Sequence, residues 1–213
     1  MKYAVLHLKG PMQSWGIGAR GDVRPSEPFP TLAGVVGMVS NGLGVLSDSD
    51  LQHFKELYTY SVSKYTTLVD YQNVGAAHSL SGFCTSTEAG YGKGNNRQTF
   101  RTYLIGAEFI CILEVADAID IEALSSPKAS MFLGRKCCVP SAPIYVGVYG
   151  TLEEAQGVVE SMAPGPKVCQ FPKGSSPESA SFLSLMDRPL LLVATKKYAP
   201  RAVGVFRVAS CLG

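Results

Sequence analysis

The sequence predicts an α+β fold: a ferredoxin-like (RRM-like) βαββαβ domain with a long β-hairpin thumb insertion and a small β-rich C-terminal part. Three observations support this prediction. An alternating apolar segment opens the chain, an apolar segment of helical length follows it, and a polar stretch over 70–101 separates two groups of strands. At 213 residues, 46% of them hydrophobic, the chain can bury a globular core.

The first strand and the first helix are predicted from periodicity and capping. Residues 2–9 alternate between an apolar and a mixed face, and a Gly-Pro pair then ends the strand. Thr31 can cap a helix over 32–43. Gly34 and two further glycines, Gly37 and Gly42, lower the helicity of that segment, so we expect close packing or a close approach of a ligand there.

The middle of the chain supplies the thumb. A capping box at Ser49 predicts a short helix whose apolar stripe extends to Leu57, and a strand is expected over 58–69. The polar stretch 70–101 is rich in glycine and interleaves aromatic with basic residues. A segment of this length without core residues is usually functional or disordered, and strand character returns over 104–115.

The C-terminal half alternates short elements. The clearest helix covers 151–162, because Thr151 and Glu154 form a second capping box ahead of an apolar face. The other predicted elements are a short helix over 119–124, strands over 131–133, 144–148, 190–195 and 202–208, a loop over 172–181 and a basic turn over 196–201. We expect one ferredoxin-like domain over 1–135, with its thumb at about 68–103, and a small β-rich subdomain over 136–213.

Composition restricts the partners and the cofactors. The net charge of +2 is small for a free-standing nucleic-acid binder, so any basic surface must be local. The six cysteines form no CxxC pair, which predicts free thiols and no metal site, and no cofactor motif is present. The N-terminus enters a strand at once, so we expect neither a signal peptide nor a membrane contact, and a cytoplasmic location.

Two segments carry the residue types that bind a sugar-phosphate backbone. Such contacts need backbone amides, hydroxyl groups and arginine or lysine, and glycines let a backbone approach closely. The stretch from Gln13 to Thr31 supplies all of these around Arg20 and Arg24. Gly134-Arg135-Lys136 supplies them again. Flat side chains for base stacking are available at Trp15, Tyr71 and Phe100.

Five ordered motifs carry a resemblance to a known family. They are Gly10-Pro11-Met12-Gln13-Ser14-Trp15-Gly16 with Arg24 and Pro30-Thr31, then Asp70-Tyr71-Gln72-Asn73-Val74, Thr102-Tyr103-Leu104-Ile105-Gly106-Ala107-Glu108-Phe109, Phe132-Leu133-Gly134-Arg135-Lys136-Cys137-Cys138-Val139-Pro140, and Lys197-Tyr198 with Arg201-Ala202-Val203. Together they resemble the CRISPR-associated CasD family, the type I-E form of the fifth Cas family in the RAMP superfamily. Leu32-Ala33 stands where that family usually has Lys-Ser, Gly106 replaces an Asp, and 81–98 matches nothing specific.

The resemblance implies a non-catalytic subunit of the Cascade complex in antiviral defence. Such a subunit grips the 5′ handle of the CRISPR guide RNA and caps the complex, with its thumb beside the backbone subunit CasC and the large subunit CasA nearby. The candidate RNA-binding residues are Gln13, Ser14, Trp15, Arg20, Arg24, Thr31, Gly34, His78, Arg101, Arg135, Lys136, Lys197 and Arg201.

Other interpretations of the same residues stay open. Trp15 can be a core residue, the arginines can be solvated surface charges, and His78 can be a polar loop residue. A related branch of the family cuts precursor RNA without metal, and His78 with Lys93 or a nearby tyrosine can supply the base and the cation that such cleavage needs. A general RNA-binding module unrelated to CRISPR is a further alternative.

Overall fold

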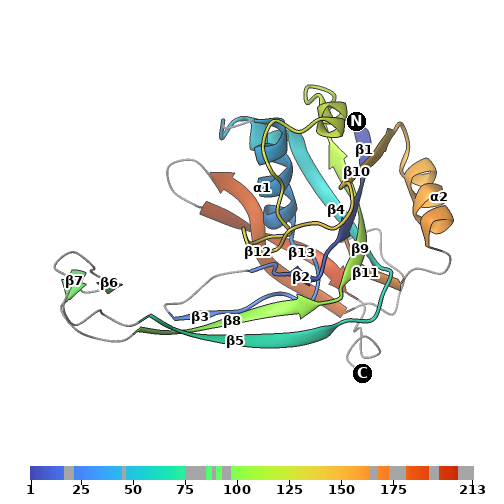
Figure 1. Ribbon diagram of the computed structural model, residues 1–213. Coiled ribbons are helices and arrows are strands. Elements are labelled where there is room, and N and C mark those ends of the chain that lie inside the picture. Colours follow the sequence, from blue (N-terminus) through green and yellow to red (C-terminus); the bar gives the residue numbers. More distant parts are fainter. Residues whose placement is uncertain are drawn as a thin grey trace.

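The computed structural model describes residues 1–16, 22–44, 47–74, 85–87, 90–92, 97–163, 167–172, 181–191 and 197–205. These residues form a seven-stranded sheet, a four-stranded sheet and a two-stranded hairpin, with few helices, as Figure 1 shows. The predicted α+β class is therefore confirmed.

The elements follow the chain in this order. They are β1 (Lys2–Lys9), β2 (Met12–Gln13), β3 (Val23–Arg24), α1 (Leu32–Leu43), the 3₁₀ helix η1 (Asp50–His53), β4 (Phe54–Ser61), β5 (Thr66–Val74), β6 (Thr85–Thr87), β7 (Gly90–Gly92), β8 (Arg97–Ile105), β9 (Glu108–Val115), the 3₁₀ helix η2 (Ile121–Ser125), β10 (Tyr145–Tyr149), α2 (Leu152–Met162), β11 (Lys167–Pro172), β12 (Ser181–Leu191) and β13 (Lys197–Val205).

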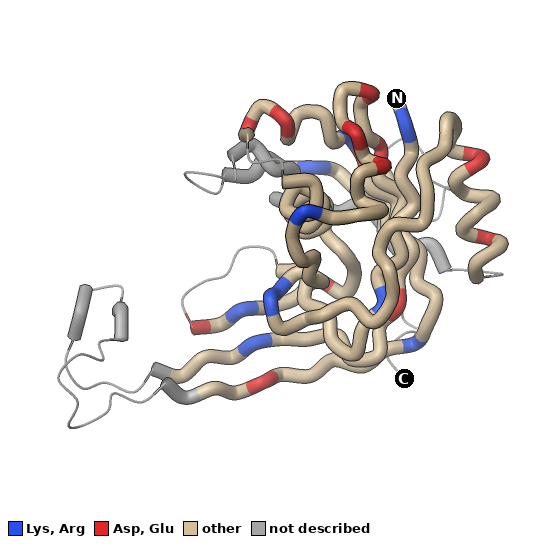
Figure 2. The backbone as a smooth tube through the Cα atoms, turned by 45° about the horizontal axis from the view of Figure 1, so that its top comes forward, with Lys and Arg blue, Asp and Glu red and all other residues tan. Residues whose placement is uncertain are grey.

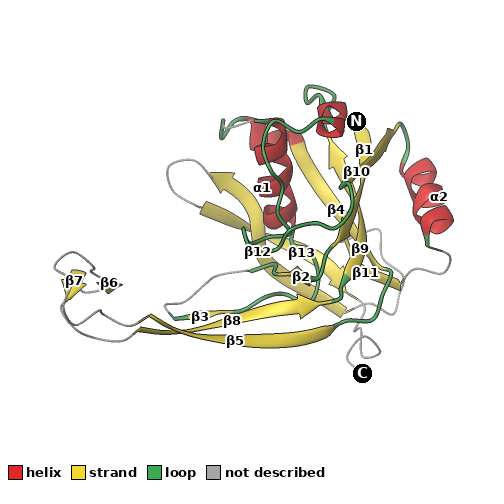
Figure 3. Ribbon diagram, in the orientation of Figure 1, coloured by secondary structure: helices red, strands yellow, loops and turns green. Residues whose placement is uncertain are grey.

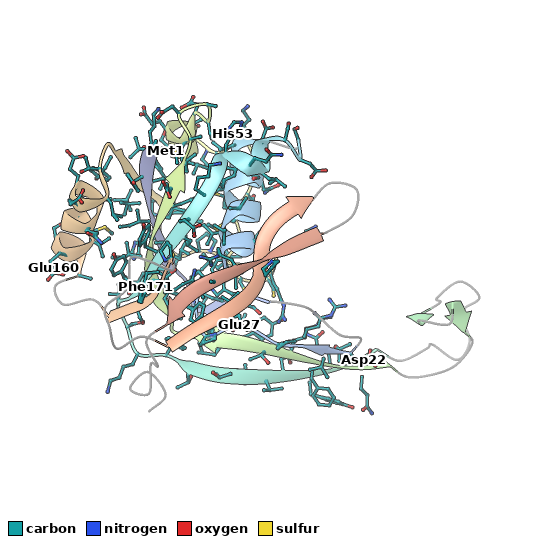
Figure 4. The ribbon with its side chains drawn as sticks, turned by 180° about the vertical axis from the view of Figure 1, so that it is seen from behind. Met1, Asp22, Glu27, His53, Glu160 and Phe171 are labelled. Atoms are coloured by element: carbon teal, nitrogen blue, oxygen red, sulfur yellow. The ribbon has the colours of Figure 1, made fainter. Side chains whose placement is uncertain are left out.

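The seven-stranded sheet separates two hydrophobic cores. Its order is β10-β1-β9-β4-β11-β13-β12, and all its neighbours are antiparallel. Helix α1 and alternate residues of β1, such as Leu6, belong to the larger core, while α2 and the intervening residues, such as Val5, belong to the smaller one. The two helices therefore cover opposite faces of the sheet, an arrangement visible in Figure 3.

Both capped helices form where the sequence predicts them. The Thr31 side chain accepts a hydrogen bond from the Gly34 amide at 3.2 Å, and α1 ends at Gly44 in the left-handed conformation. Thr151 and Glu154 complete the predicted capping box of α2. In both cases a local side-chain contact satisfies amides that the first helical turn leaves without partners.

The helix predicted from Ser49 is wrong beyond its first turn. Ser49 makes no side-chain cap, η1 ends at His53, and β4 begins at Phe54. Phe54 pairs with Val115 and Leu57 with Leu113, with an irregular register between the two pairs. The irregularity lets residues three apart face the same core, so a strand with a bulge produced the spacing of a helical stripe.

Several strand boundaries also differ from the prediction. The strand expected over 58–69 divides into β4 and β5, and the one expected over 104–115 breaks at Gly106, whose φ is +72°. Residues 131–133, predicted as a strand, lie in a loop. Leu133 is apolar because its side chain is buried in the core, not because it belongs to a sheet. Strand β11 was not predicted, β12 begins at Ser181, and β13 takes in the residues expected as a basic turn.

The subdivision into 1–135 and 136–213 stays a prediction. Strands from both sides of that boundary hydrogen-bond within the seven-stranded sheet, since β10 pairs with β1 and β11 pairs with β4. Within the described residues, none of the helices has the length and apolar character needed to cross a membrane.

Two glycines of α1 offer a test of its packing. A Cβ at Gly34 would lie 2.8 Å from Cε3 of Trp15, whereas a Cβ at Gly37 would meet nothing within 4 Å. We expect Gly37→Ala to raise the free energy of unfolding by about 1 kcal/mol, because alanine is the better helix former. Gly34→Ala should lower it by about 1–3 kcal/mol through overpacking. Urea unfolding of the purified chain measures both, and equal stabilisation by the two substitutions would contradict the packing of Trp15 on α1.

Candidate nucleic-acid interface

A long β ribbon projects from the body of the protein (Figure 1). Strands β5 and β8 pair antiparallel from Thr66 opposite Ile105 to Val74 opposite Arg97. On the other edge of β8, β2 pairs antiparallel at its base and β3 pairs parallel further out. The strands expected at the base of the thumb therefore form a sheet with two accessible faces.

One face of the ribbon is polar and basic. Arg24 of β3 is the register partner of Arg101 of β8, so the two side chains emerge on the same face of adjacent strands. Figure 2 shows basic positions, drawn in blue, on neighbouring strands of the ribbon. The Arg24 side chain is exposed, and no hydrogen bond or ion pair to it occurs among the described residues. We call this pair, Arg24 and Arg101, the arginine pair.

Among the described residues, no ion pair joins the arginine pair to the acid across the ribbon. Asp70 is the register partner of Arg101, but its carboxylate accepts a hydrogen bond from Gln72 at 2.7 Å. The buried Nε of Arg101 and the buried hydroxyl of Thr99, two residues away on the same face, have no hydrogen-bond partner among the described residues. Buried polar groups without partners are uncommon, but neither atom is exposed enough to contact RNA from this position.

The opposite face of the ribbon is apolar. Its exposed side chains include Val23 (54% exposed), Val69 (58%), Tyr71 (52%) and Phe100 (40%). The rings of Tyr71 and Phe100 pack against each other across the strands, with centroids 5.4 Å apart. We call these four residues the apolar stripe. Flat rings of this kind can stack on bases or pack against a protein partner.

Gln13, Ser14 and Trp15 of the opening motif lie inside the protein, and the side chains of Gln13 and Ser14 connect the ribbon to the body. The Gln13 side-chain amide donates to the carbonyls of Leu8 at 2.9 Å and Ala107 at 2.7 Å, and its oxygen accepts from Nε1 of Trp15 at 3.0 Å. Trp15 is 1% exposed. The Ser14 hydroxyl donates to the carbonyl of Thr102 at 2.9 Å.

The expected roles of these residues change accordingly. Of the interpretations left open for Trp15, the structure supports the core residue, because a buried ring cannot stack on a base. Gln13, Ser14 and Thr31 are also buried, so their side chains cannot reach RNA from these positions. Gly34 gives room to the Trp15 ring.

The turn that follows Leu133 packs against the opening motif. Gly134 has φ +89°, and a Cβ there would lie 1.8 Å from the Ser14 carbonyl oxygen. Arg135 donates to the carbonyls of Thr102 at 3.1 Å and Arg24 at 2.8 Å. Lys136 is exposed. Sequence reasoning expected Arg135 and Lys136 to act alike, but only the lysine projects into solvent.

Tyr103 lies beneath Arg135, whose guanidinium carbon is 4.9 Å from the ring centroid. Burial is the main cause that raises the pKa of the Tyr103 hydroxyl, and a contact with the thiol of Cys137 at 3.6 Å adds to it. The Tyr103 hydroxyl therefore keeps its proton, and the face of the neutral ring contacts the Arg135 guanidinium.

The remaining candidate residues do not extend the arginine pair. Arg201 is 3% exposed and lies 3.6 Å from the carboxylate of Glu56, inside the body. With the Gln170 amide turned so that its oxygen faces Arg201, the guanidinium also donates to it at 2.6 Å. Lys197 begins β13, and its side chain lies outside the described residues, as do Arg20, His78 and Lys93.

An acid with two basic neighbours, which sequence reasoning did not single out, joins β1 to β9. Glu108 contacts His7 Nε2 at 2.7 Å and Lys9 Nζ at 3.1 Å. Burial acts to raise the pKa of Glu108, but the hydrogen bonds with His7 and Lys9 outweigh it and hold the pKa below its usual value. The sequence does place His7 and Lys9 on one face of the first strand, and this pattern could have indicated an acidic partner on a neighbouring strand. Among the described residues, no group of three His, Cys, Asp or Glu side chains could hold a metal ion.

Comparisons with known proteins give a consistent result. A family model described as CRISPR-associated protein (Cas_Cas5) matches residues 3–208. The chain is 28% identical over 158 residues to the CRISPR system Cascade subunit CasD of Escherichia coli strain K12, covering 68% of this chain and 70% of that protein.

Two solved structures have a similar fold. A chain of a CRISPR RNA-guided surveillance complex matches with a TM-score of 0.70 and 22% identity, covering 99% of this chain and 93% of the other. A structure titled as a crystal structure of a Cas protein matches with a TM-score of 0.55 and 23% identity, covering 99% and 97%. At these identities the likeness concerns the fold.

Gly134 gives a test of how the turn packs on the opening motif. We expect Gly134→Ala to lower the free energy of unfolding by more than about 3 kcal/mol, because a Cβ would overlap the Ser14 carbonyl and the backbone must move. Gly106→Ala is the matched control, since its φ is also positive but no atom lies within 4 Å. It should cost only about 1–2 kcal/mol for the left-handed conformation. Urea unfolding compares the two, and equal losses would show that the close approach is not present.

Proposed function

Since the chain belongs to the CRISPR-associated Cas5 family, we propose that it is a non-catalytic Cascade subunit that binds the 5′ handle of the guide RNA and caps the complex. The named relative at 28% identity is a Cascade subunit, which supports the same role here. The observation that carries the RNA-binding part is the arginine pair on the polar face of the ribbon, where Arg24 is exposed.

The physical argument rests on charge and on strand geometry. RNA affinity comes largely from phosphate contacts by arginine and lysine, which release counterions. Arg24 and Arg101 stand on adjacent strands, whose spacing of about 4.8 Å is close enough for both to contact one bent stretch of backbone. Base identity then plays a small part at this face, because arginines that contact phosphates position a strand without reading it.

The fold supports the same assignment. We read β1, α1, β4, β9, η2 and β10 as the ferredoxin-like unit, because α1 crosses from β1 to β4, β9 lies between these two strands, and η2 stands where the second helix is expected. The ribbon is then the thumb, inserted between the second and third strands of that unit.

The two faces of the thumb suggest two kinds of partner. The polar face suits the guide RNA, and the apolar stripe suits the protein subunits that adjoin it in a Cascade complex, which the family resemblance identifies as CasC and CasA. Assembly of this kind takes place in the cytoplasm. Lys136 and Lys197 are further candidate RNA contacts, because both belong to the family motifs and Lys136 is exposed.

Salt dependence tests the arginine pair. We expect Arg24→Gln and Arg101→Gln to weaken binding of single-stranded repeat RNA. Each should also reduce the slope of log affinity against log salt by about 0.7, the value for one lost phosphate contact on a single strand. Fluorescence anisotropy with labelled RNA measures both quantities. Lys2→Gln removes the same charge at the far end of β1 and should leave the slope unchanged. Unchanged slopes in both arginine variants would remove the pair from the RNA interface.

Co-purification tests the assignment to the complex. Expression of the tagged chain with its neighbouring Cascade genes should yield a complex whose bound RNA, once sequenced, begins with repeat-derived nucleotides. Bound RNA without repeat sequence would contradict the handle assignment and favour a general RNA-binding module. The lone chain incubated with repeat RNA in EDTA should leave the RNA intact, and specific cuts would instead show the metal-independent endoribonuclease.

A further inference from the structure

Strand β3, at one edge of the ribbon, is too short to be stable through its own pairing with β8. Strand β3 consists of Val23 and Arg24, both of which are exposed, so no buried side chain anchors it. Its pairing with β8 includes the hydrogen bond from the Phe100 amide to the Asp22 carbonyl at 2.9 Å. Strands in globular proteins are usually about five or six residues long, and a pair this short has little intrinsic stability.

Arg135 connects this strand to its neighbour. One guanidinium nitrogen donates to the Arg24 carbonyl of β3, and the other donates to the Thr102 carbonyl of β8. The planar fork of arginine matches two acceptors on adjacent strands, and its stacking on Tyr103 fixes the plane of the fork. A lysine has no planar fork, so it cannot place two fixed donors on the two carbonyls while lying flat on the ring.

Backbone hydrogen bonds and buried side chains anchor the turn that contains Arg135. The carbonyl of Leu133 accepts from the Ser14 amide at 3.1 Å, and the carbonyl of Arg135 accepts from the Cys138 amide at 2.8 Å. Leu133 and Cys138 are both fully buried. The Arg135 side chain therefore starts from an anchored backbone, and its guanidinium reaches β3 and β8.

We propose that Arg135 is a positioning residue, which clamps β3 onto β8 so that Arg24 stands beside Arg101. The clamp opposes the mutual repulsion of the arginine pair, which otherwise favours separation of the short strand. Arg135 thus acts on RNA binding through Arg24 rather than by contacting RNA itself, in contrast to the contact that the family motif implies. The RNA part of this inference rests on the proposed function, whereas the clamp itself does not.

Hydrogen exchange in the free full-length protein tests the clamp without RNA. In Arg135→Lys and Arg135→Met, we expect the Phe100 amide to exchange faster than in the unaltered protein, while amides shared by β1 and β9 keep their protection. Lys136→Met removes a charge from the adjacent, exposed position and should leave the Phe100 amide unchanged. Unchanged Phe100 exchange in both arginine variants overturns the proposal, and so does faster exchange throughout β1 and β9, because Arg135 would then support the whole fold.

RNA binding tests the consequence of the clamp with single-stranded repeat RNA as the probe. Arg135→Lys keeps the charge, so a phosphate contact that depends on charge alone predicts nearly unaltered affinity. The positioning role predicts a loss of about tenfold, the size expected for one charge-assisted hydrogen bond. Combined with Arg24→Gln, the lysine substitution should cause little further loss, because both changes act on one contact.

The outcomes separate the two proposals. Full affinity in Arg135→Lys, or additive losses in the double variant, overturns the positioning role and leaves the RNA-binding function standing. Absence of RNA binding by the unaltered protein, both alone and within the complex, overturns the proposed function, and the exchange experiment still decides whether Arg135 clamps β3.

Discussion

The buried amide of Gln13 is the contact on which the junction between the body and the ribbon depends. It reaches the end of β1 through Leu8 and the start of β9 through Ala107, and it accepts the indole N–H of Trp15. A buried amide in an apolar surrounding is costly unless its groups are paired, and here both its nitrogen and its oxygen have partners. This network fixes where the chain leaves the sheet and where the ribbon begins.

Much of the fold follows from local sequence signals. The alternation of β1 and the caps at Thr31 and Thr151 correctly predict three elements, because each depends on neighbours in the chain. The errors arise where tertiary contacts decide. The bulge between Phe54 and Leu57 imitates a helical stripe, and Leu133 is apolar because it anchors a loop.

The candidate site shows the same division. Gln13, Ser14 and Trp15 of the opening motif were predicted to bind RNA, yet they are buried, since a motif identifies important residues without stating which way they face. Arg24 and Arg101 are far apart in sequence, and only the parallel pairing of β3 with β8 brings them together. That pairing leaves no pattern that could be read in advance from a two-residue strand.

Under the proposed function, the modest charge of the molecule has a consequence for how a guide RNA reaches it. The chain carries a net charge of +2, and its arginine pair is a local feature on a nearly neutral surface. Long-range attraction scales with the summed field of a protein, so such a surface captures few passing polyanions from solution. In a cell crowded with transcripts, selectivity of loading would then arise from the order of assembly, with the strand delivered by partners rather than collected by this chain.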